Sequence, residues 1–240
     1  DALFNYLSAL KISNKENYRP ADIQIIGKDI LKFHAIIWPA LLLATGEELP
    51  KKLLVHGFIN VDGKKMSKSL GNVVTPAALK ERYGVEATRY LLFRQLSFYD
   101  DSNFSWAEFD ALYNGELANG IGNLVSRAIT LFKKFDCRGA VEAILAEEER
   151  EVSEHLTDQD FRGALDQISE FVSIADGWFS SKKPWEWRDL DASKKAELVE
   201  ASRLIRISDL LTSFMPETAK EIRRQLETLQ SKPLFPRLQK

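Results

Sequence analysis

Two short apolar runs, separated by a helical pattern, constrain the fold of this chain more than any other feature. The first run covers residues 22–27 and ends in a glycine, and the second covers residues 53–56. Between them, apolar residues recur with helical spacing over residues 30–43. A strand–helix–strand order favours a parallel sheet, and such sheets bind ligands at the carboxyl ends of their strands. The pattern therefore predicts an α/β fold whose ligand-binding edge includes Gly27 and His56.

A basic run, residues 62–72, follows the predicted sheet. Residues 58–61 alternate and then meet Asp62-Gly63, a strong signal for a two-residue hairpin. Lys65 and Lys68 can place two ammonium groups near one polyphosphate, and the serines beside them can donate hydrogen bonds to phosphate oxygens. A loop at the end of a hairpin suits a residue that closes on a transferring phosphate and then releases it. The alternative interpretation of these lysines is a solvated basic turn.

The second half of the chain has a helical pattern throughout. Steps of three and four between apolar residues, or helix start signals, predict helices over 117–135, 161–179, 193–214 and 217–229. Ser105 and Glu108 have the spacing of a capping box. Because amphipathic helices bury their apolar stripes on one another, the pattern predicts an antiparallel helical bundle.

These patterns divide the chain into three predicted domains. Residues 1–60 form the α/β part, and residues 101–240 form the helical part. Residues 61–100 contain the basic loop and further helices, the first of which is expected to start at Thr75-Pro76, with Gly84 as an interruption.

Composition excludes several classes of protein. The single cysteine, Cys137, excludes an internal disulfide and a cysteine-cluster zinc site within these residues. No apolar run is long enough to span a bilayer, and the start has no secretory signal pattern, so a cytoplasmic protein with no membrane partner is expected. The formal net charge is only −2, so any RNA would have to bind through local basic and aromatic patches.

Several polar residues have spacings that suit ligand binding. Asp29 follows the first strand, where a carboxylate can accept both ribose hydroxyls of a nucleoside; the alternative is a helix cap. Asn123 and Arg127 lie four residues apart on one helix, and Trp185 follows Lys-Lys-Pro; together they could read a base edge and stack on single-stranded RNA. His34 lies on an apolar helix face, where a histidine is usually a core residue.

Residues 65–72, KMSKSLGN, resemble the KMSKS signature of class I aminoacyl-tRNA synthetases. The flanking segments narrow this resemblance to the methionyl-tRNA synthetase family, and it covers essentially the whole chain. The segments are 26–30 (IGKDI), 33–34 (FH), 38–40 (WPA), 55–57 (VHG) and 233–237 (PLFPR).

This resemblance implies a methionine–tRNA ligase. Such an enzyme uses ATP, accompanied by Mg²⁺, to convert L-methionine to methionyl-adenylate, and then transfers the methionyl group to tRNA(Met), whose anticodon is CAU. The implied fold is a partial Rossmann-like catalytic core over residues 1–60, a subdomain with the KMSKS loop that contacts the tRNA stem over 61–100, and an all-α anticodon-binding bundle over 101–240. No metal site is expected within this chain.

The resemblance also implies roles for individual residues. Lys65 and Lys68 would be catalytic. The implied ATP contacts are Gly27, Asp29, His56, Ile59, Lys65, Met66, Ser67, Lys68 and Ser69. The implied methionine contacts are Ala2, Tyr6, Ile30 and His34, with Leu3 at a position where some members of the family have proline. The implied anticodon contacts are Asn123, Arg127, Pro184 and Trp185.

No His-x-Gly-His motif occurs in the sequence. The chain is therefore expected to be the C-terminal portion of a longer enzyme, with the missing N-terminal half as its partner, and to be inactive alone. A second class I synthetase for an apolar amino acid would explain only residues 65–69. A non-catalytic tRNA-binding module derived from such an enzyme remains an alternative, although a pure binder does not need a phosphate-closing loop.

Overall fold

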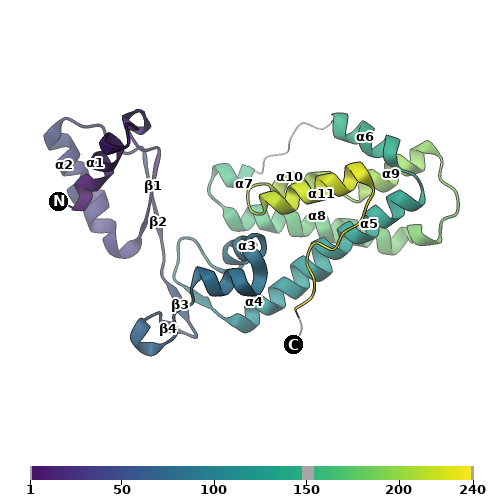
Figure 1. Ribbon diagram of the computed structural model, residues 1–240, viewed down its shortest axis with the longest axis horizontal. Coiled ribbons are helices and arrows are strands. Elements are labelled where there is room, and N and C mark those ends of the chain that lie inside the picture. The colour runs from purple at the N-terminus through teal and green to yellow at the C-terminus, as the bar shows by residue number, and fades with distance from the viewer. Residues whose placement is uncertain (1, 148–153, 239–240) are drawn as a thin grey trace. The chain divides into compact units, whose positions relative to one another are not determined.

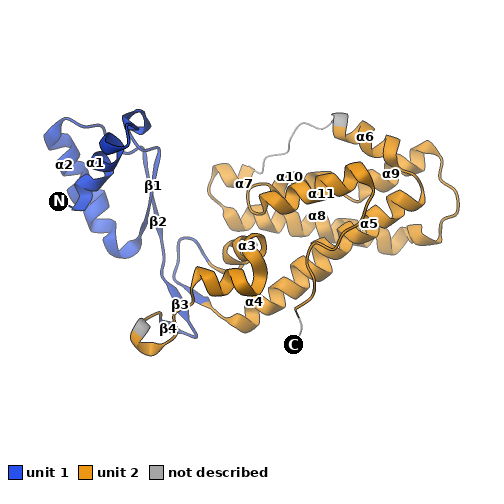
Figure 2. Cartoon of the chain, in the orientation of Figure 1, with its two compact units in different colours: residues 1–65, 97–103 blue, residues 66–96, 104–240 orange. Residues whose placement is uncertain are grey.

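The computed structural model describes residues 2–147 and 154–238 (Figure 1). The chain folds into two compact units (Figure 2). Unit 1 comprises residues 1–65 and 97–103, and unit 2 comprises residues 66–96 and 104–240. In the described ranges, no helix combines the length and the apolar composition needed to cross a bilayer.

Unit 1 contains short helices around a pair of strands; short 3₁₀ or π segments are labelled η. In chain order the elements are η1 (Ala2–Phe4), α1 (Asn5–Ile12), η2 (Glu16–Tyr18), β1 (Ile23–Gly27), η3 (Lys28–Ile30), the π-helical η4 (Phe33–Ile37), α2 (Trp38–Thr45) and β2 (Lys52–His56).

β1 and β2 pair in parallel, which confirms the strand–helix–strand prediction. The register aligns Ile23 with Lys52 at one end and Gly27 with His56 at the other. Parallel strands cannot be joined by a tight turn, so the chain crosses over through η3, η4 and α2. Gly46, in the left-handed conformation, ends α2 and starts the return to β2.

The predicted hairpin is also present. β3 (Ile59–Val61) pairs antiparallel with β4 (Lys64–Lys65) through a turn in which Asp62 has a φ of 50° and Gly63 a φ of 73°. Two consecutive positive φ angles are those of a type I′ turn, which matches the right-handed twist of a hairpin.

A third strand, β5 (Ser102–Phe104), joins the other edge of β3, so the purely helical prediction for residues after 100 is wrong there. The backbone N–H of Ser102 donates to the Phe58 carbonyl at 2.8 Å, and the Gly63 N–H donates to Asn103 Oδ1 at 2.6 Å. These partners lie about forty residues away in sequence, so the strand is stabilised by tertiary contacts and not by its own pattern.

Unit 2 begins with the signature segment, including η5 (Lys68–Leu70), and continues into α3 (Pro76–Gln95). As predicted, Thr75 caps this helix: its side chain accepts a hydrogen bond from the Ala78 N–H at 3.2 Å. Gly84, with φ 79° and ψ 167°, interrupts the helix where its sequence predicts a break.

Most of the remaining helices contribute buried side chains to an apolar core. The remaining helices are α4 (Trp106–Leu112), the π-helical η6 (Tyr113–Gly122), α5 (Asn123–Lys134), α6 (Arg138–Glu147), α7 (Glu154–Thr157), α8 (Phe161–Lys182), η7 (Pro184–Glu186), α9 (Ala192–Ala201), α10 (Leu204–Leu211) and α11 (Pro216–Thr228). α10 packs against both α8 and α11 (Figure 1). Fully buried core side chains include Leu124, Phe132, Leu165 and Phe179.

Two local predictions in unit 2 are wrong. The helix expected over 193–214 is divided into α9 and α10, because Arg203 adopts a φ of 53° between them. Ser105 does precede α4, but its side chain makes no capping bond. Glu108, expected to complete the capping box, instead accepts a hydrogen bond from Gln95 Nε2 at 2.7 Å.

Of the glycines of unit 1, Gly57 is the one at which an added Cβ would come closest to other atoms. A Cβ at this position would lie 2.2 Å from the backbone C and O atoms of Asp100. We expect Gly57→Ala to lower the free energy of unfolding of unit 1 by about 1–3 kcal/mol, since the backbone would have to move apart. Hydrogen exchange of peptides that cover β2 and β3 would measure the change.

Gly177→Ala in α8 is the matched control, because a Cβ there meets no atom within 4 Å. It should be neutral, or stabilise unit 2 by up to about 1 kcal/mol, as alanine favours a helix over glycine. Unchanged protection of β2 and β3 in Gly57→Ala would contradict the close approach seen at Asp100.

Candidate functional site

The carboxyl ends of β1 and β2 bring three of the predicted ligand-binding residues together. Gly27 and His56 are partners in the parallel register. An ideal Cβ on Gly27 would lie 2.7 Å from Asp29 Oδ1 and 3.6 Å from His56 Cε1. A carboxylate, an imidazole and a bare stretch of backbone therefore surround one point at the edge of the sheet. Asp29 lies inside η3 and Gly27 occupies its N-cap position, so the alternative role of Asp29 as a helix cap is wrong.

The imidazole of His56 has a defined tautomer when neutral. Nδ1 lies 2.9 Å from the Gly57 carbonyl oxygen, which can only accept, so Nδ1 donates and Nε2 is left as an acceptor. The ring packs edge-on against Phe98 at 6.2 Å. Ile59 is the first residue of β3 and is exposed. This edge presents acceptor groups and an apolar surface, which suits a ribose and a flat heterocycle.

Sequence reasoning missed an ion pair beside this edge. Lys28 Nζ lies 2.6 Å from Asp101 Oδ1 and 2.7 Å from Oδ2, and it sits 4.7 Å from the centroid of the Phe58 ring. The Lys28 ammonium lowers the pKa of Asp101, whose carboxylate also accepts a hydrogen bond from the Phe58 N–H. Lys65, at the end of β4, lies 5.5 Å from the same ring. The ammonium groups of Lys28 and Lys65 therefore both lie near the aromatic ring of Phe58.

The signature segment is organised by its own polar groups. Ser67 N–H donates to Asn72 Oδ1 at 2.9 Å, and the hydroxyls of Ser67 and Ser69 are 3.1 Å apart. Leu70 N–H donates to Ser67 Oγ at 3.3 Å. Met66 is half-buried, and the side chain of Lys68 lies outside the described part of the structure. Asn72 closes this loop.

Three of the predicted methionine contacts also meet. Tyr6 OH lies 3.0 Å from His34 Nε2, and His34 Nδ1 lies 3.1 Å from the Ile30 carbonyl oxygen. Since that carbonyl can only accept, a neutral His34 carries its proton on Nδ1, and the tyrosine hydroxyl donates to Nε2. His34 is only 7% exposed, and Tyr6 also packs on the buried Trp38 at 5.8 Å. Ala2 is an exposed residue of η1.

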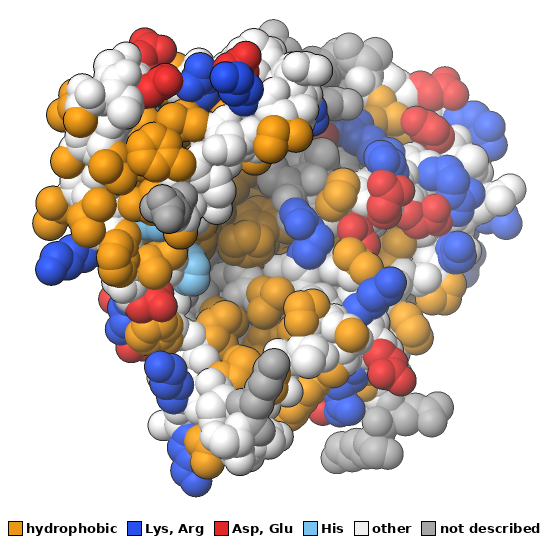
Figure 3. Space-filling view, turned by 60° about the vertical axis from the view of Figure 1, so that its left-hand side comes forward, with side chains coloured by type: hydrophobic (Ala, Val, Ile, Leu, Met, Phe, Trp, Pro, Cys, Tyr) orange, Lys and Arg blue, Asp and Glu red, His pale blue; other side chains and the backbone are white. Residues whose placement is uncertain are grey.

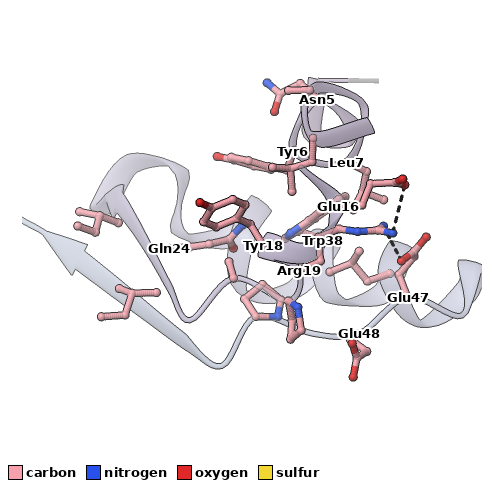
Figure 4. Close-up of a pocket in the computed structure, with 18 residues that line it drawn as sticks. Asn5, Tyr6, Leu7, Glu16, Tyr18, Arg19, Gln24, Trp38, Glu47 and Glu48 are labelled. Carbon is pink, nitrogen blue, oxygen red and sulfur yellow. Dashed lines mark hydrogen bonds and ion pairs between the residues drawn. The ribbon is translucent and has the colours of Figure 1, made fainter. Parts of the chain in front are cut away.

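A cavity of unit 1 lies next to this group and not at the Gly27 edge. It has a volume of about 950 Å³, and of the predicted site residues only Tyr6 lines it (Figure 4). Three of its lining residues carry buried polar atoms with no hydrogen-bond partner among the described residues: Arg19 Nε, Gln24 Oε1 and Trp38 Nε1. Arg19 is otherwise held by Glu47 at 2.8 Å.

In unit 2, two of the predicted RNA-binding residues, Arg127 and Trp185, lie against each other. The Arg127 guanidinium lies 5.6 Å from the Trp185 ring centroid and 5.4 Å from that of Phe179. Trp185 is 45% exposed, whereas Pro184 before it is buried. Asn123 is exposed one turn before Arg127 on α5. The arrangement offers a flat aromatic surface next to a cation and an amide.

Two further residues hold this arrangement in place, and sequence reasoning missed both. Asp176 of α8 accepts a hydrogen bond from Arg127 at 2.9 Å. Burial raises the pKa of Asp176, and the charge of Arg127 opposes that rise. Lys134 donates to the carbonyl oxygens of Trp185 and Trp187 at 2.9 Å and 3.2 Å, which ties the segment after α8 to α5. Within residues 2–147 and 154–238, no three His, Cys, Asp or Glu side chains are grouped so that they could hold a metal ion.

Comparison with known proteins gives consistent matches. Residues 1–129 match the family model described as tRNA synthetases class I (M). A methionine–tRNA ligase of Rhizobium meliloti (strain 1021) is 38% identical over 239 residues, covering 91% of this chain and 46% of that protein. One of Caldanaerobacter subterraneus subsp. tengcongensis is 39% identical, covering 94% of this chain and 39% of that protein.

Comparison with solved structures points to the same family as the sequence matches. Mycobacterium tuberculosis methionyl-tRNA synthetase in complex with methionyl-adenylate matches with a TM-score of 0.79 and 30% identity, covering 98% of this chain and 55% of that one. The chain therefore spans about half the length of the relatives that it matches.

A double-mutant cycle would test the Tyr6–His34 contact. Tyr6→Phe leaves a buried acceptor on His34 unpaired and should lower the free energy of unfolding by about 1–3 kcal/mol. Combined with His34→Leu, we expect a coupling of about 1 kcal/mol, measured by urea denaturation. The exposed Tyr18 supplies the control Tyr18→Phe, for which no change is expected. If the changes in the free energy of unfolding caused by Tyr6→Phe and His34→Leu are additive in the double mutant, the contact is contradicted.

Proposed function

The chain belongs to the methionyl-tRNA synthetase family of class I tRNA synthetases, and we propose that it forms part of a methionine–tRNA ligase. The observation that carries this proposal is the convergence of Gly27, Asp29 and His56 at one edge of the parallel pair, in a chain that also contains the signature segment 65–69. The substrates are L-methionine, ATP with Mg²⁺ and tRNA(Met) with its CAU anticodon.

ATP binds at the edge of β1 and β2. Asp29 accepts hydrogen bonds from the ribose hydroxyls, and the absence of a side chain at Gly27 lets the nucleoside approach the backbone. His56 and Ile59 border the adenine. Lys65, Lys68 and the segment Met66–Ser69 contact the phosphates, where the two ammonium groups compensate the charge that develops on the leaving pyrophosphate.

Methionine binds beside Tyr6 and His34, and Ile30 and Ala2 also contact it. The pair suits a thioether, which is polarizable and only a weak acceptor, because the histidine and the tyrosine satisfy each other. The methionine carboxylate attacks the α-phosphorus in line; the bond from the α-phosphorus to the bridging oxygen breaks, and pyrophosphate leaves. A hydroxyl of the terminal ribose of tRNA then attacks the acyl carbon and releases AMP. This chain supplies positioning and charge, and no general base is required of it.

The anticodon binds in unit 2. Trp185, supported by the buried Pro184, stacks on an unpaired base, while Arg127 and Asn123 contact a phosphate or a base edge. The geometry supports this role because Arg127 is already held against Trp185 by Asp176.

The catalytic fold is completed by a segment outside this chain. Parallel sheets are almost always covered on both faces and contain more than two strands, yet among the described residues β1 pairs with β2 alone. On β1, Ile23 and Ile25 are 46% and 63% exposed, and further hydrophobic side chains lie on the surface (Figure 3). We infer that the N-terminal half of the same polypeptide adds a parallel strand beside β1, as in a Rossmann-like fold, and that the isolated 240 residues are inactive.

A tRNA-binding module without catalytic activity is the second candidate. One observation favours it: the Arg127–Trp185 arrangement is complete within this chain, whereas the sheet of unit 1 is not. Amino-acid activation distinguishes the two candidates, because only a ligase carries it out.

Methionine-dependent exchange of pyrophosphate into ATP tests the ligase in the full-length protein. We expect exchange with methionine but not with leucine or isoleucine. Lys68→Ala should lower the rate by roughly 10²–10³-fold, since it removes one charged group aimed at the transition state. Lys64→Ala, at the exposed neighbouring position of β4, is the control and should leave the rate unchanged. Exchange with no amino acid would favour the binding module.

Substitution of Trp185 tests the anticodon site. Loss of one base–aromatic stack costs about 1–3 kcal/mol, so Trp185→Ala should weaken binding of tRNA with the CAU anticodon by roughly 5- to 150-fold. Trp185→Phe retains a stacking face and should bind nearly as tightly as the wild type. Equal affinity of wild type and Trp185→Ala in a filter-binding or anisotropy titration would remove this assignment.

A further inference from the structure

The hairpin of β3 and β4 determines which of two neighbouring lysines faces Phe58. Its register pairs Asn60 with Lys65 and Val61 with Lys64. Because side chains alternate between the two faces along a strand, Phe58, directly before β3, shares a face with Asn60 and has Lys65 as a diagonal neighbour. Lys64 belongs to the opposite face. The ammonium of Lys65 accordingly lies 5.5 Å from the centroid of the Phe58 ring.

The backbone of Phe58 is held by the segment 97–103 of unit 1. Its N–H donates to Asp101 Oδ1 at 2.8 Å, and its carbonyl oxygen accepts a hydrogen bond from the Ser102 N–H at 2.8 Å. Both backbone polar groups of Phe58 are therefore bonded. The preceding Gly57 approaches Asp100 so closely that a Cβ would lie 2.2 Å from its backbone. These contacts fix the point from which the ring of Phe58 projects.

Asp101 connects this point to the proposed nucleoside site. Its carboxylate accepts from Lys28 Nζ through both oxygens, at 2.6 Å and 2.7 Å. Lys28 directly precedes Asp29 in the sequence, and its ammonium lies 4.7 Å from the centroid of the Phe58 ring. One carboxylate thus binds both the neighbour of the proposed ribose-binding residue and the residue whose ring faces Lys65.

The aromatic ring and the carboxylate act differently on a lysine. The charge of Lys28 is compensated by Asp101. The ring of Phe58 attracts a cation through its negative face but carries no net charge. The contact therefore orients the ammonium of Lys65 without neutralising it. A lysine side chain has several flexible torsions, so an ammonium that is oriented in advance costs less to order when it meets an anion.

We propose that Phe58 is a positioning residue for amino-acid activation, and that its ring holds the ammonium of Lys65 where it contacts the phosphates of ATP. The inference rests on the proposed function, in which Lys65 compensates charge on the leaving pyrophosphate. Phe58 acts only through Lys65. Asp101 anchors the ring and so fixes the position of this charge relative to Asp29.

Stepwise fluorination of the Phe58 ring in the full-length protein tests the proposal. Site-specific mono-, di- and trifluorinated phenylalanine weaken the negative face of the ring in steps and change its size little. Each step should lower kcat for methionine-dependent pyrophosphate exchange, by about 2- to 30-fold over the series, which is the effect of losing one cation–π contact. KM for methionine should stay unchanged, because Tyr6 and His34 are not altered.

A double-mutant cycle tests whether Phe58 acts through Lys65. Phe58→Leu should lower the single-turnover rate of methionyl-adenylate formation by about 2- to 30-fold, both in the wild type and in Lys64→Ala. In Lys65→Ala, the same substitution should have no further effect. Lys64→Ala is the matched control, because this exposed lysine is in the same strand but on the other face. Phe58→Tyr keeps an aromatic face and should retain the rate in all three backgrounds.

Two results would overturn the inference. One is a kcat that does not change across the fluorinated series. The other is an equal effect of Phe58→Leu with and without Lys65, which would indicate that the ring only stabilises the fold. Failure of the proposed function is a separate result, since the wild-type protein would then form no methionyl-adenylate.

Discussion

The parallel pairing of β1 with β2 is the constraint on which the candidate nucleotide site depends. Because the strands run the same way, both carboxyl ends reach one edge, and the register brings Gly27 beside His56. The crossover that parallel strands require starts with η3, which turns Asp29 back over Gly27. The same crossover continues into η4 and so places His34 opposite Tyr6. One topological requirement therefore brings together the residues of both candidate small-molecule sites of unit 1.

In unit 2, polar contacts between helices help to hold long helices in fixed positions. Arg127 is oriented by Asp176 and by two aromatic rings, and Arg94 is oriented by Glu116 and Asp166. In each case an arginine from one helix binds a carboxylate on another, which fixes direction as well as distance. The proposed RNA-binding arrangement and the contact between α3 and η6 use the same type of interaction. A flat, exposed Trp185 can then be presented by a rigid support.

Features with a local cause could be predicted from the sequence. The Asp62-Gly63 turn and the Thr75 cap depend on residues within four positions, and both are present. The strand β5 could not be predicted, since its hydrogen bond to Phe58 joins residues far apart in sequence. The capping box was predicted wrongly, because Glu108 accepts a hydrogen bond from Gln95 instead. The candidate ligand-binding residues themselves could be identified from sequence motifs. Their supports, such as Asp176 at 49 positions from Arg127, were not, because only the packing of α5 on α8 brings them together.

We propose that β1 and β2 belong to a larger parallel sheet, which another segment of the polypeptide completes. The decisive measurement is hydrogen exchange over residues 23–27, compared between the 240-residue chain and the full-length protein. We expect the amides of β1 to exchange much more slowly in the full-length protein, because an added strand would form hydrogen bonds with the edge of β1 that β2 leaves open. Equal exchange rates in the two proteins would show that no strand is added and that unit 1 has a two-stranded sheet.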